Sequence, residues 1–349
     1  MTDNGHRRAG TLARSTADRA LTLADVAALA GVSQMTVSRV INGGRDVSAT
    51  TRVAVERAIE QTGYVAHHAA RSLVTRRTNS VAFVVSESQD RFFHDPVFGA
   101  MALGANERLA VEDMQLVCIA CATDSDRRRV SQYVRAGHVD GALLASWRRD
   151  DPLLRELAGP RVAAVMAGRP PRSISIPFVD VDNRGAARAV VRHLAMVGCT
   201  KIATITGPLE MSSGRDRLAG FKDAVGRATF DPRLVVQGDY GHASGMRAMA
   251  ELLDHAPDID GVFAASDAMA AGALAALQQA GRRVPVDVRV AGFDDSPIAT
   301  EVQPALTTVH QPLQEMGGRM AELLVDRLCG RDAPASVILP TRVVHRDSA

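Results

Sequence analysis

From residue 81 onwards, short apolar runs alternate with stretches of helical spacing, and this alternation limits the chain to few folds. The apolar runs are residues 81–86, 115–120, 141–146, 162–167, 201–206, 234–239, 261–266 and 288–293. Strands that are apolar along their whole length are typical of parallel sheets with helices packed on both faces. We therefore expect an α/β body whose eight strands form one large sheet or two smaller ones.

Polar residues stand at the ends of several apolar runs. They are Ser86, Ser146, Asp239, Ser266, Asp267, Asp294 and Asp295. Because ligands of open parallel sheets bind at the carboxyl ends of the strands, the sequence predicts a binding cleft there. Asp267 has a second explanation, since it can cap the helix expected at residues 267–281, and we favour that role for it.

Three short helices are expected before the α/β body. They cover residues 23–30, 34–41 and 51–61, and their inward faces consist of Val26, Leu29 and Ala30, of Val37, Val40 and Ile41, and of Val55, Ala58 and Ile59. Ser33 and Ser48 are candidate N-caps, and Gly31 and Gly63 are candidate C-terminal stops. Residues 1–20 are polar without an apolar period, so we expect a disordered tail.

The first two helices are separated by residues 31–33, a turn of the length that helix-turn-helix units use. With its valines packed inward, the second helix presents mostly polar residues outward. These residues are Gln34, Met35, Thr36, Ser38, Arg39 and Asn42. Amide, hydroxyl and guanidinium groups can read base edges and hold phosphates, which favours DNA binding. The pattern alone also fits a small three-helix bundle with one solvated helix.

Charge is distributed unevenly along the chain, although the net charge is only +2. Residues 1–80 contain eleven arginines and six acidic residues, whereas the remainder carries 30 basic and 33 acidic residues. A basic head on a slightly acidic body suits a protein that binds phosphates at one end. An arginine-rich surface without a DNA-binding role would show the same excess.

Several classes of protein do not fit this composition. No apolar run approaches the roughly 20 residues that span a bilayer, and no apolar segment follows the first arginines as in a secretory signal. The four cysteines are too few for a disulfide framework, so we expect a cytoplasmic, nucleoid-associated protein without a membrane partner. Cys118 and Cys121 have metal-site spacing but lie on an expected strand, which favours a buried structural role. We expect no enzyme, cofactor or metal.

The words TLxDVAxxAGVSxxTVSRVIN, VSxxTRxxV and GY, within residues 22–64, closely resemble the head of the LacI/GalR (lac-repressor) family. The resemblance implies that Gln34 and Met35 read the major groove and that Arg39 contacts a guanine edge. It implies phosphate contacts for Thr36, Ser38, Asn42 and Ser48. Because Met35 has no amide group, we expect it to make an apolar contact, for example with a thymine methyl group.

The segment AARSL at residues 69–73 resembles the hinge helix of the same family. This implies that Ala70 lies at a close contact between two hinge helices and that Leu73 is a wedge in the minor groove. A leucine inserted at a base step kinks the duplex. Ala66 and His67 stand in place of the usual Pro and Asn, which should loosen the start of the helix, and His67 is a candidate phosphate contact.

The resemblance continues through the body in words such as VDVDNRGAA at 179–187, GRDRLAGF at 214–221 and FAASDAMAAGAL at 263–274. It implies a periplasmic-binding-protein-like body in which two lobes, joined by three crossovers, hold a sugar-sized ligand between them. Gly168-Arg169 stands where many sugar-binding members have an acid. The chain resembles most closely actinobacterial-type regulators of plant-derived oligosaccharides, cellobiose-like ones among them.

A sugar site needs fixed charged groups and an aromatic face, because sugar hydroxyls both donate and accept hydrogen bonds. By the resemblance, Arg217 supplies a guanidinium fork, Asp294 accepts from hydroxyls and Tyr240 provides the aromatic platform. Ser266 and Gln311 are candidate polar lining residues. From the first lobe we add Asp95 and Phe98.

We therefore expect a small all-α helix-turn-helix head and an α/β periplasmic-binding-protein-like body of two doubly wound lobes. The expected domains are a tail (1–20), the head (21–65), a hinge helix with linker (66–79) and an effector-binding and dimerisation body (80–349). The expected function is that of a homodimeric repressor, bound to a pseudo-palindromic double-stranded DNA operator and released by a sugar or oligosaccharide. The alternatives are a corepressor-dependent regulator, a sugar-binding module without a regulatory role and a sugar hydrolase.

Overall fold

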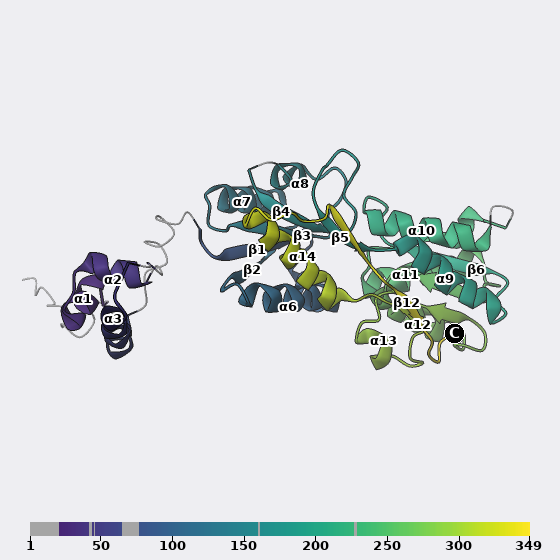
Figure 1. The fold of residues 1–349 in the computed structure, drawn as a ribbon. Helices are drawn as coiled ribbons and strands as arrows, with labels where there is room; N and C mark the ends of the chain where they lie inside the picture. The colour runs from purple at the N-terminus through teal and green to yellow at the C-terminus, as the bar shows by residue number, and fades with distance from the viewer. Residues whose placement is uncertain (1–20, 42–43, 45, 65–76, 160, 227–228) are drawn as a thin grey trace, which may run out of the picture. The chain divides into compact units, whose positions relative to one another are not determined.

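The computed structural model describes residues 21–41, 44, 46–64, 77–159, 161–226 and 229–349 (Figure 1). It contains two compact units, one that ends at Arg77 and one that comprises residues Thr78–Ala349. The expected tail at residues 1–20 lies outside the described residues, as do four candidate DNA contacts. These are Asn42, His67, Ala70 and Leu73.

The first unit has the three helices that the sequence predicts: α1 (Leu23–Ala30), α2 (Gln34–Ile41) and α3 (Ala49–Thr62). The predicted caps are confirmed. Ser33 and Ser48 each accept a hydrogen bond from the backbone amide three residues further on, at 3.1 and 3.2 Å. Gly31 and Gly63 end α1 and α3 with φ angles of 66° and 62°, a left-handed conformation that glycine adopts without strain.

Side chains from all three helices form the core of the first unit. Its buried members are Val26, Ala27, Val37, Val40, Val55, Ala58 and Tyr64. The prediction for Leu29 is wrong, because its side chain is 52% exposed. The inner face of α1 is centred between residues 23, 26, 27 and 30, and at 3.6 residues per turn Leu29 lies about 110° from that centre.

The second unit is built from two lobes, of which the first contains a six-stranded parallel sheet. The strand order is β11-β5-β4-β3-β1-β2. The strands are β1 (Ser80–Val85), β2 (Gln115–Ala120), β3 (Gly141–Ala145), β4 (Ala163–Ala167), β5 (Phe178–Val181) and β11 (Ser336–Leu339). The helices of this lobe are α5 (Gln89–His94), α6 (Pro96–Ala110), α7 (Asp124–Arg135), α8 (Pro152–Leu157) and α14 (Leu313–Leu328).

The second lobe contains a four-stranded parallel sheet of order β7-β6-β8-β9, so the two-sheet possibility is the correct one. Its strands are β6 (Ile202–Thr206), β7 (Val235–Gln237), β8 (Gly261–Ala264) and β9 (Arg289–Ala291). Single bridges join its edge to the antiparallel pair β10 (Thr308–His310) and β12 (Arg342–Val344). The helices are α9 (Asn183–Met196), α10 (Ser212–Val225), α11 (His242–His255), α12 (Asp267–Gln279) and the short α13 (Ile298–Glu301), with a 3₁₀ turn at Pro232–Leu234.

Each strand contributes side chains to both faces of its sheet, which explains why the strands are apolar throughout. In β1, Val81, Phe83 and Val85 pack with residues of α6 and α14, whereas Ala82 and Val84 pack on the opposite face with residues of α7 and α8. In the second lobe, α11 and α12 cover one face and α9 and α10 the other. Helices on both faces are what the continuous apolar runs predict.

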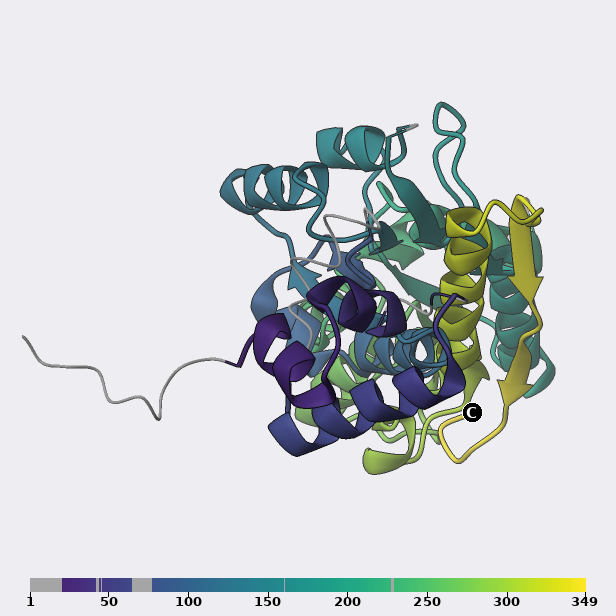
Figure 2. The same cartoon turned by 60° about the vertical axis from the view of Figure 1, so that its left-hand side comes forward.

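The chain passes between the two lobes three times, as the family resemblance implies. It crosses from β5 to α9, from β10 to α14 and from β11 to β12. Figures 1 and 2 show the last of these, in yellow, running from one lobe into the other. Along this crossover the chain is split at Pro340 into β11 and β12, which belong to different sheets. Proline has no amide hydrogen to donate to a ladder.

Candidate ligand-binding cleft and nucleic-acid interface

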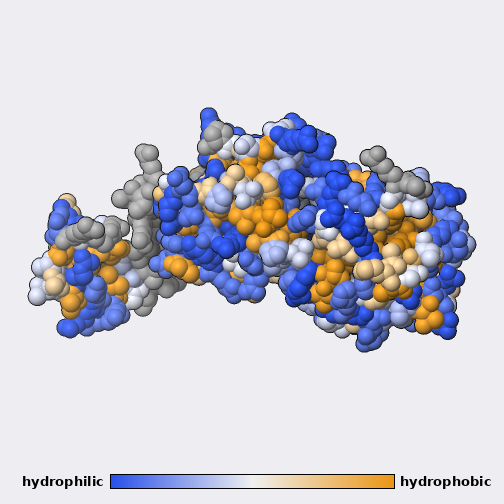
Figure 3. Space-filling view, turned by 45° about the vertical axis from the view of Figure 1, so that its right-hand side comes forward, coloured by the Kyte–Doolittle hydropathy of each residue, from blue (hydrophilic) through white to orange (hydrophobic). Residues whose placement is uncertain are grey.

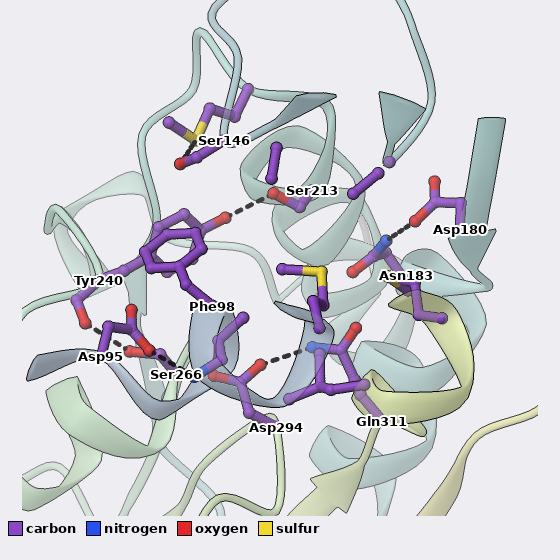
Figure 4. A pocket seen from close by; sticks show the side chains of 18 of the residues that line it. Asp95, Phe98, Ser146, Asp180, Asn183, Ser213, Tyr240, Ser266, Asp294 and Gln311 are labelled. Atoms are coloured by element: carbon purple, nitrogen blue, oxygen red, sulfur yellow. Dashed lines mark hydrogen bonds between the residues drawn. The ribbon is translucent and has the colours of Figure 1, made fainter. Parts of the chain in front are cut away.

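A cleft opens between the two lobes of the body at the carboxyl ends of their strands, where the sequence predicts one. All seven candidate effector residues line it, and Figure 4 shows six of them by label around one space. They are Asp95 and Phe98 from the first lobe, Arg217, Tyr240, Ser266 and Asp294 from the second, and Gln311 at the crossover into α14. The structure thus brings together residues that are far apart in the sequence.

Arg217 lies on α10 with its side chain almost fully buried and its guanidinium group held on several sides. Its Nε donates to Asn183 Oδ1 at 2.8 Å, and its Nη1 donates to the carbonyl oxygen of Ala265 at 2.6 Å. The group also lies over the ring of Phe293, 3.6 Å from the ring centroid. A guanidinium fixed in this way can present its remaining N–H groups to a ligand without reorganisation.

Asp294 follows β9 and faces Arg217 at the base of the cleft, with Oδ1 3.5 Å from Nη1 of the guanidinium. Gln311 Nε2 donates to the same oxygen at 2.6 Å. Burial raises the pKa of Asp294 strongly, against the opposing effect of Arg217, and the nearby Asp267 raises it further. Asp294 has a φ of 116°, in the region that side chains rarely adopt. The fold therefore holds a carboxyl group in a strained, buried position that faces a binding space.

Tyr240 and Ser266 form one wall of the cleft. The Tyr240 hydroxyl lies 2.8 Å from Ser213 Oγ, and its backbone carbonyl accepts a hydrogen bond from the Ser266 hydroxyl at 3.0 Å. The Ser266 hydroxyl also accepts from the Met269 amide and caps α12. The prediction that Asp267 is the cap is therefore wrong.

The carboxyl group of Asp267 lies inside the second lobe instead of capping α12. It is fully buried and accepts hydrogen bonds from the Thr308 hydroxyl at 2.5 Å and the Ser296 amide at 2.8 Å. These bonds connect the start of α12 with β10 and the loop after Asp294. Asp267 therefore supports the backbone of the cleft without being a cap.

Asp95 lies between α5 and α6, and Phe98 lies in the first turn of α6. Asp95 accepts from the Val97 amide at 3.1 Å and caps α6, and burial raises its pKa, with Arg91 opposing the shift. Phe98 is 3% exposed. The Arg91 guanidinium lies 5.8 Å from the centroid of Phe98 and 5.4 Å from that of Tyr240. Arg91 therefore links aromatic rings of the two lobes across the cleft.

Sequence reasoning missed several lining residues. Arg91, Asp180, Asn183, Ser212, Ser213 and four methionines (Met101, Met166, Met211, Met316) also line the cleft. Asn183 donates to Asp180 in the first lobe at 2.9 Å while it accepts from Arg217 in the second. The words VDVDN and MSSGRDR contain the polar members except Arg91, but the methionines carry no signal that separates them from core residues.

Trp147, in the loop after β3, also lines the cleft. It is 4% exposed, and its indole Nε1 is buried with no hydrogen-bond partner among the described residues. The same holds for Nε of Arg91. The Oγ of Ser296, another lining residue, also has no partner in the part of the chain that the structure describes. Buried donors are normally satisfied, so these unpaired donors around one cleft are suited to a ligand with acceptor oxygens.

The two cysteines with metal-site spacing do not form a site. Cys121 is buried as predicted, but Cys118 is exposed, so a buried role is wrong for that residue. Among the residues that the structure describes, no group of three or more histidine, cysteine or acidic side chains could hold a metal ion. No described helix is long and apolar enough to cross a membrane.

The second helix of the first unit, α2, has one buried and one exposed side. Val37 and Val40 are buried in the head core. On the other side Gln34, Met35 and Arg39 are exposed, with Met35 at 66%, and Thr36 and Ser38 are partly exposed. Ser48 is exposed at the start of α3 and lies within hydrogen-bond distance of the Thr50 and Thr51 hydroxyls. An exposed methionine between an amide and a guanidinium is suited to reading a groove rather than to packing.

Comparisons with known proteins identify both parts of the chain. The model of bacterial regulatory proteins, lacI family, matches residues 22–67, and the model of the periplasmic binding protein-like domain matches residues 191–349. The chain is 46% identical over 335 residues to the HTH-type transcriptional regulator CelR of Thermobifida fusca, which covers 94% of this chain and 98% of that protein. It is 34% identical to the ribose operon repressor of Escherichia coli (strain K12), which covers 88% and 93%.

Solved structures agree with the sequence relatives. A complex of the transcriptional regulator CelR with cellobiose is 43% identical, covers 94% of this chain and 100% of that chain, and has a TM-score of 0.75. The lac repressor dimer bound to operator and the anti-inducer ONPF is 27% identical, covers 95% and 99%, and has a TM-score of 0.83. With a helix-turn-helix head, a two-lobed body and relatives that match along nearly the whole length, this chain belongs to the LacI family of bacterial transcriptional regulators.

Proposed function

We propose that this chain is a repressor whose affinity for its operator falls when a cellobiose-like sugar occupies the cleft. The observation that carries the proposal is the fixed pair of Arg217 and Asp294 beside the Tyr240 ring. A guanidinium that donates, a carboxyl group that accepts and an aromatic face are the three elements that bind a sugar ring. The solved relative that was bound to cellobiose supports this class of effector.

The remaining lining residues fit the same ligand. Asp95 and Gln311 add acceptor and donor groups to the site, while Phe98 and Ser266 shape its wall. The unpaired Nε1 of Trp147 would donate to a ring or glycosidic oxygen. We propose these residues, together with Arg217, Tyr240 and Asp294, as the effector site.

The DNA contacts belong to the head (21–65) and the hinge and linker (66–79), while residues 80–349 bind effector and dimerise. We propose that Gln34, Met35 and Arg39 read base edges and that Thr36, Ser38 and Ser48 contact phosphates. By resemblance, Asn42 and His67 add phosphate contacts, Ala70 packs between hinge helices and Leu73 enters the minor groove.

We propose that two copies bind one pseudo-palindromic operator, because two-fold symmetry in the protein is mirrored in the site. The lac repressor was solved as a dimer on its operator. In this chain, Leu103 on α6 and Val286 after α12 are large apolar side chains that are 50% and 66% exposed. Figure 3 shows further apolar patches on one face of the body. Such residues can be buried between copies.

The test is operator binding measured by fluorescence anisotropy on DNA from upstream of the gene, at fixed salt, with and without cellobiose. We expect a preference for one duplex over competitor DNA and a loss of that affinity when cellobiose is added. Arg39→Ala should remove the preference, whereas Arg57→Ala on the exposed side of α3 should retain it. The absence of any duplex preference would contradict the proposal.

The same experiment separates the alternatives. A cellobiose-dependent increase in operator affinity would indicate corepression, and sugar binding without any effect on DNA would indicate a binding module alone. Because Asp95, Asp180 and Asp294 all lie around the cleft, an aryl-glycoside hydrolysis assay on the purified chain tests for an enzyme. We expect no turnover.

A further inference from the structure

A second hollow, which we call the arginine hollow, adjoins the cleft and takes no part in the proposed function. It has a volume of about 600 Å³, and four arginines line it: Arg149, Arg169, Arg172 and Arg215. Asp216 is the one acidic residue of its lining. A hollow surrounded by four positive groups and one negative group is a place where an anion would be bound.

The fold brings these arginines together from three segments. Arg149 lies in the loop after β3, and Arg169 and Arg172 lie in the loop between β4 and β5, all at the carboxyl ends of first-lobe strands. Arg215 lies in the first turn of α10 in the second lobe. The backbone amide of Arg149 donates to the carbonyl oxygen of Glu210 at 3.1 Å and so holds the two sides together. Figure 1 shows the β4–β5 loop beside α10.

The arginines of the hollow outnumber the carboxylates that act on them, which are Asp216 and Glu210 at Arg215 and Asp180 at Arg169. Among the ion pairs that join described residues, none includes a guanidinium group of Arg149, Arg169, Arg172 or Arg215. The pKa of Arg215 is lowered by burial and by the repulsion of Arg149, and the attraction of Asp216 and Glu210 opposes this shift. Like charges in one concavity repel each other, and an anion that lies between them removes the repulsion. Guanidinium forks also match the geometry of carboxylate and phosphate groups.

The arginine hollow and the effector cleft meet at two points. Ser212 lines both spaces. Gly168 lines the cleft and its neighbour Arg169 lines the hollow. Gly168 has a φ of 83°, and a side chain built on it would point toward Ser212 Oγ, 3.7 Å away. Because Ser212 lines both spaces, the cleft and the hollow lie side by side, and a sugar ring in the cleft can present a substituent to the hollow.

We propose that the arginine hollow binds the anionic group of an acidic sugar, either a carboxylate or a phosphate ester, while the sugar ring occupies the cleft. This inference rests on the proposed function, because it places the ring where the effector binds. It changes the effector class from neutral sugars alone to sugar acids or sugar phosphates, which the arginine hollow distinguishes from their neutral counterparts.

Calorimetric titration of the full chain with matched pairs tests the proposal. The pairs are cellobiose with its aldonic acid, cellobionate, and glucose with glucose 6-phosphate; inorganic phosphate serves as the free anion. At low salt we expect the preferred acidic sugar to bind about 10-fold more tightly than its neutral partner, the effect of one further charge-assisted hydrogen bond. Which pair shows the difference identifies carboxylate or phosphate as the group that is bound.

Variants of the hollow test whether the preference for an acidic sugar comes from the body or from the basic head. In the double variant Arg149→Gln/Arg172→Gln the preference for the acidic sugar should fall to near one, and cellobiose should bind as before. Arg155→Gln, an exposed arginine of α8 outside the hollow, is the matched control and should keep the preference. Competition by inorganic phosphate against the acidic sugar but not against cellobiose would also support the proposal.

Equal affinities within both pairs would overturn the arginine hollow as a ligand site, as would a preference that survives the double variant. Either result leaves the proposed function intact if cellobiose still releases the operator. If the acidic sugars bind through the hollow and release the operator while cellobiose does not, the arginine-hollow proposal holds and the neutral effector is wrong. The two proposals therefore fail in distinguishable ways.

Discussion

The positive charge of Arg217 faces the buried carboxyl group of Asp294. Replacing Arg217 therefore removes a charged partner from the cleft as well as a side chain. In Arg217→Ala, Asp294 keeps Gln311 but loses the cation, and Asn183 loses its guanidinium partner. We expect the dissociation constant for the sugar to rise by about 10- to 100-fold, the effect of a lost charged hydrogen bond. Operator affinity without sugar should stay near that of the unmodified chain, because the head is a separate unit. Titration calorimetry and anisotropy measure the two constants.

Arg217→Gln is the control for this variant. Glutamine retains a donor toward Asn183 without the charge, so a correctly folded Arg217→Gln chain that also responds poorly shows that the charge matters and not the packing. Normal release of the operator by sugar in both variants would mean that the effector site has been assigned to the wrong residues.

The raised pKa of Asp294 leads us to expect that sugar binding depends on pH. Burial raises its pKa to about 8, so a large part of the population is protonated at neutral pH. Because the pKa of Asp294 is higher in the folded protein than the ordinary value of 3.8, its contribution to the free energy of unfolding is fully present below pH 3.8. This contribution is lost as the pH rises through the pKa of the folded protein. A sugar hydroxyl that donates to Asp294 favours the ionised form. Affinity should therefore increase between about pH 6 and pH 9, with release of a proton.

Calorimetry in two buffers of different ionisation enthalpy, such as HEPES and Tris, counts the protons that are released. Asp294→Asn has no such proton and should lose the pH dependence along with much of the affinity. Proton uptake on binding would show instead that the protonated carboxyl group donates to the sugar, and the assigned role of Asp294 as an acceptor would be wrong.

Among the helices and strands, the sequence predicts those whose ends are set by residues close by in the chain. The bounds of α1 and α2 could be read from the Gly31 stop and the Ser33 cap, because caps act within one turn. β5 and β10 were missed, since strands of four and three residues with Asp180 or Thr308 inside them do not form an apolar run. α10 begins at Ser212, although Ser212, Ser213 and Gly214 are weak helix formers, because tertiary packing holds these residues in the helix.

The correction at Leu29 gives a stability prediction for the head. Val37 is fully buried between the helices, whereas Leu29 is half exposed. Val37→Ala should destabilise the head by about 1–3 kcal/mol through the lost contacts and the cavity that remains. Leu29→Ala should change the stability by less than about 0.5 kcal/mol, as is usual for surface sites.

Hydrogen exchange of α1–α3 peptides in the full chain measures this difference, because the exchange rate of buried amides reports local opening. Faster exchange is expected across all three helices in Val37→Ala and not in Leu29→Ala. If Leu29→Ala loosened the head as much as Val37→Ala, the side chain of Leu29 would have to be packed, contrary to its position on α1.

At the scale of the whole molecule, the candidate site could be predicted only in part. The seven candidate effector residues lie together in the cleft, although residues 95 and 311 are far apart in the sequence. Strand ends indicate the edge of a sheet, but nothing local shows which loops of two lobes meet. Arg91, Trp147 and Asn183 become candidates only once the three crossovers place the lobes face to face.

Residues at the crossovers also connect the cleft with the segments that join the two lobes. Asn183 and Gln311 stand at two of the three crossovers, and Arg217 and Asp294 join them in one buried hydrogen-bonded chain. A sugar that bonds to Arg217 and Asp294 therefore contacts groups that are bonded to the segments connecting the lobes. Any change in the angle between the lobes would change the contacts of the sugar, and such a difference in contacts is the condition for a shift between two states.

The effect of the sugar on operator binding and the effect of the operator on sugar binding must be equal. This relation can be measured without knowing the structural change. If cellobiose weakens operator binding by some factor, the operator must weaken cellobiose binding by the same factor, because both describe one coupling free energy. Calorimetric titration of cellobiose into the free chain and into the operator-bound chain gives the factor directly. In a repressor that its sugar releases, the operator-bound chain binds the sugar more weakly. Tighter binding of cellobiose by the operator-bound chain would assign the sugar as a corepressor.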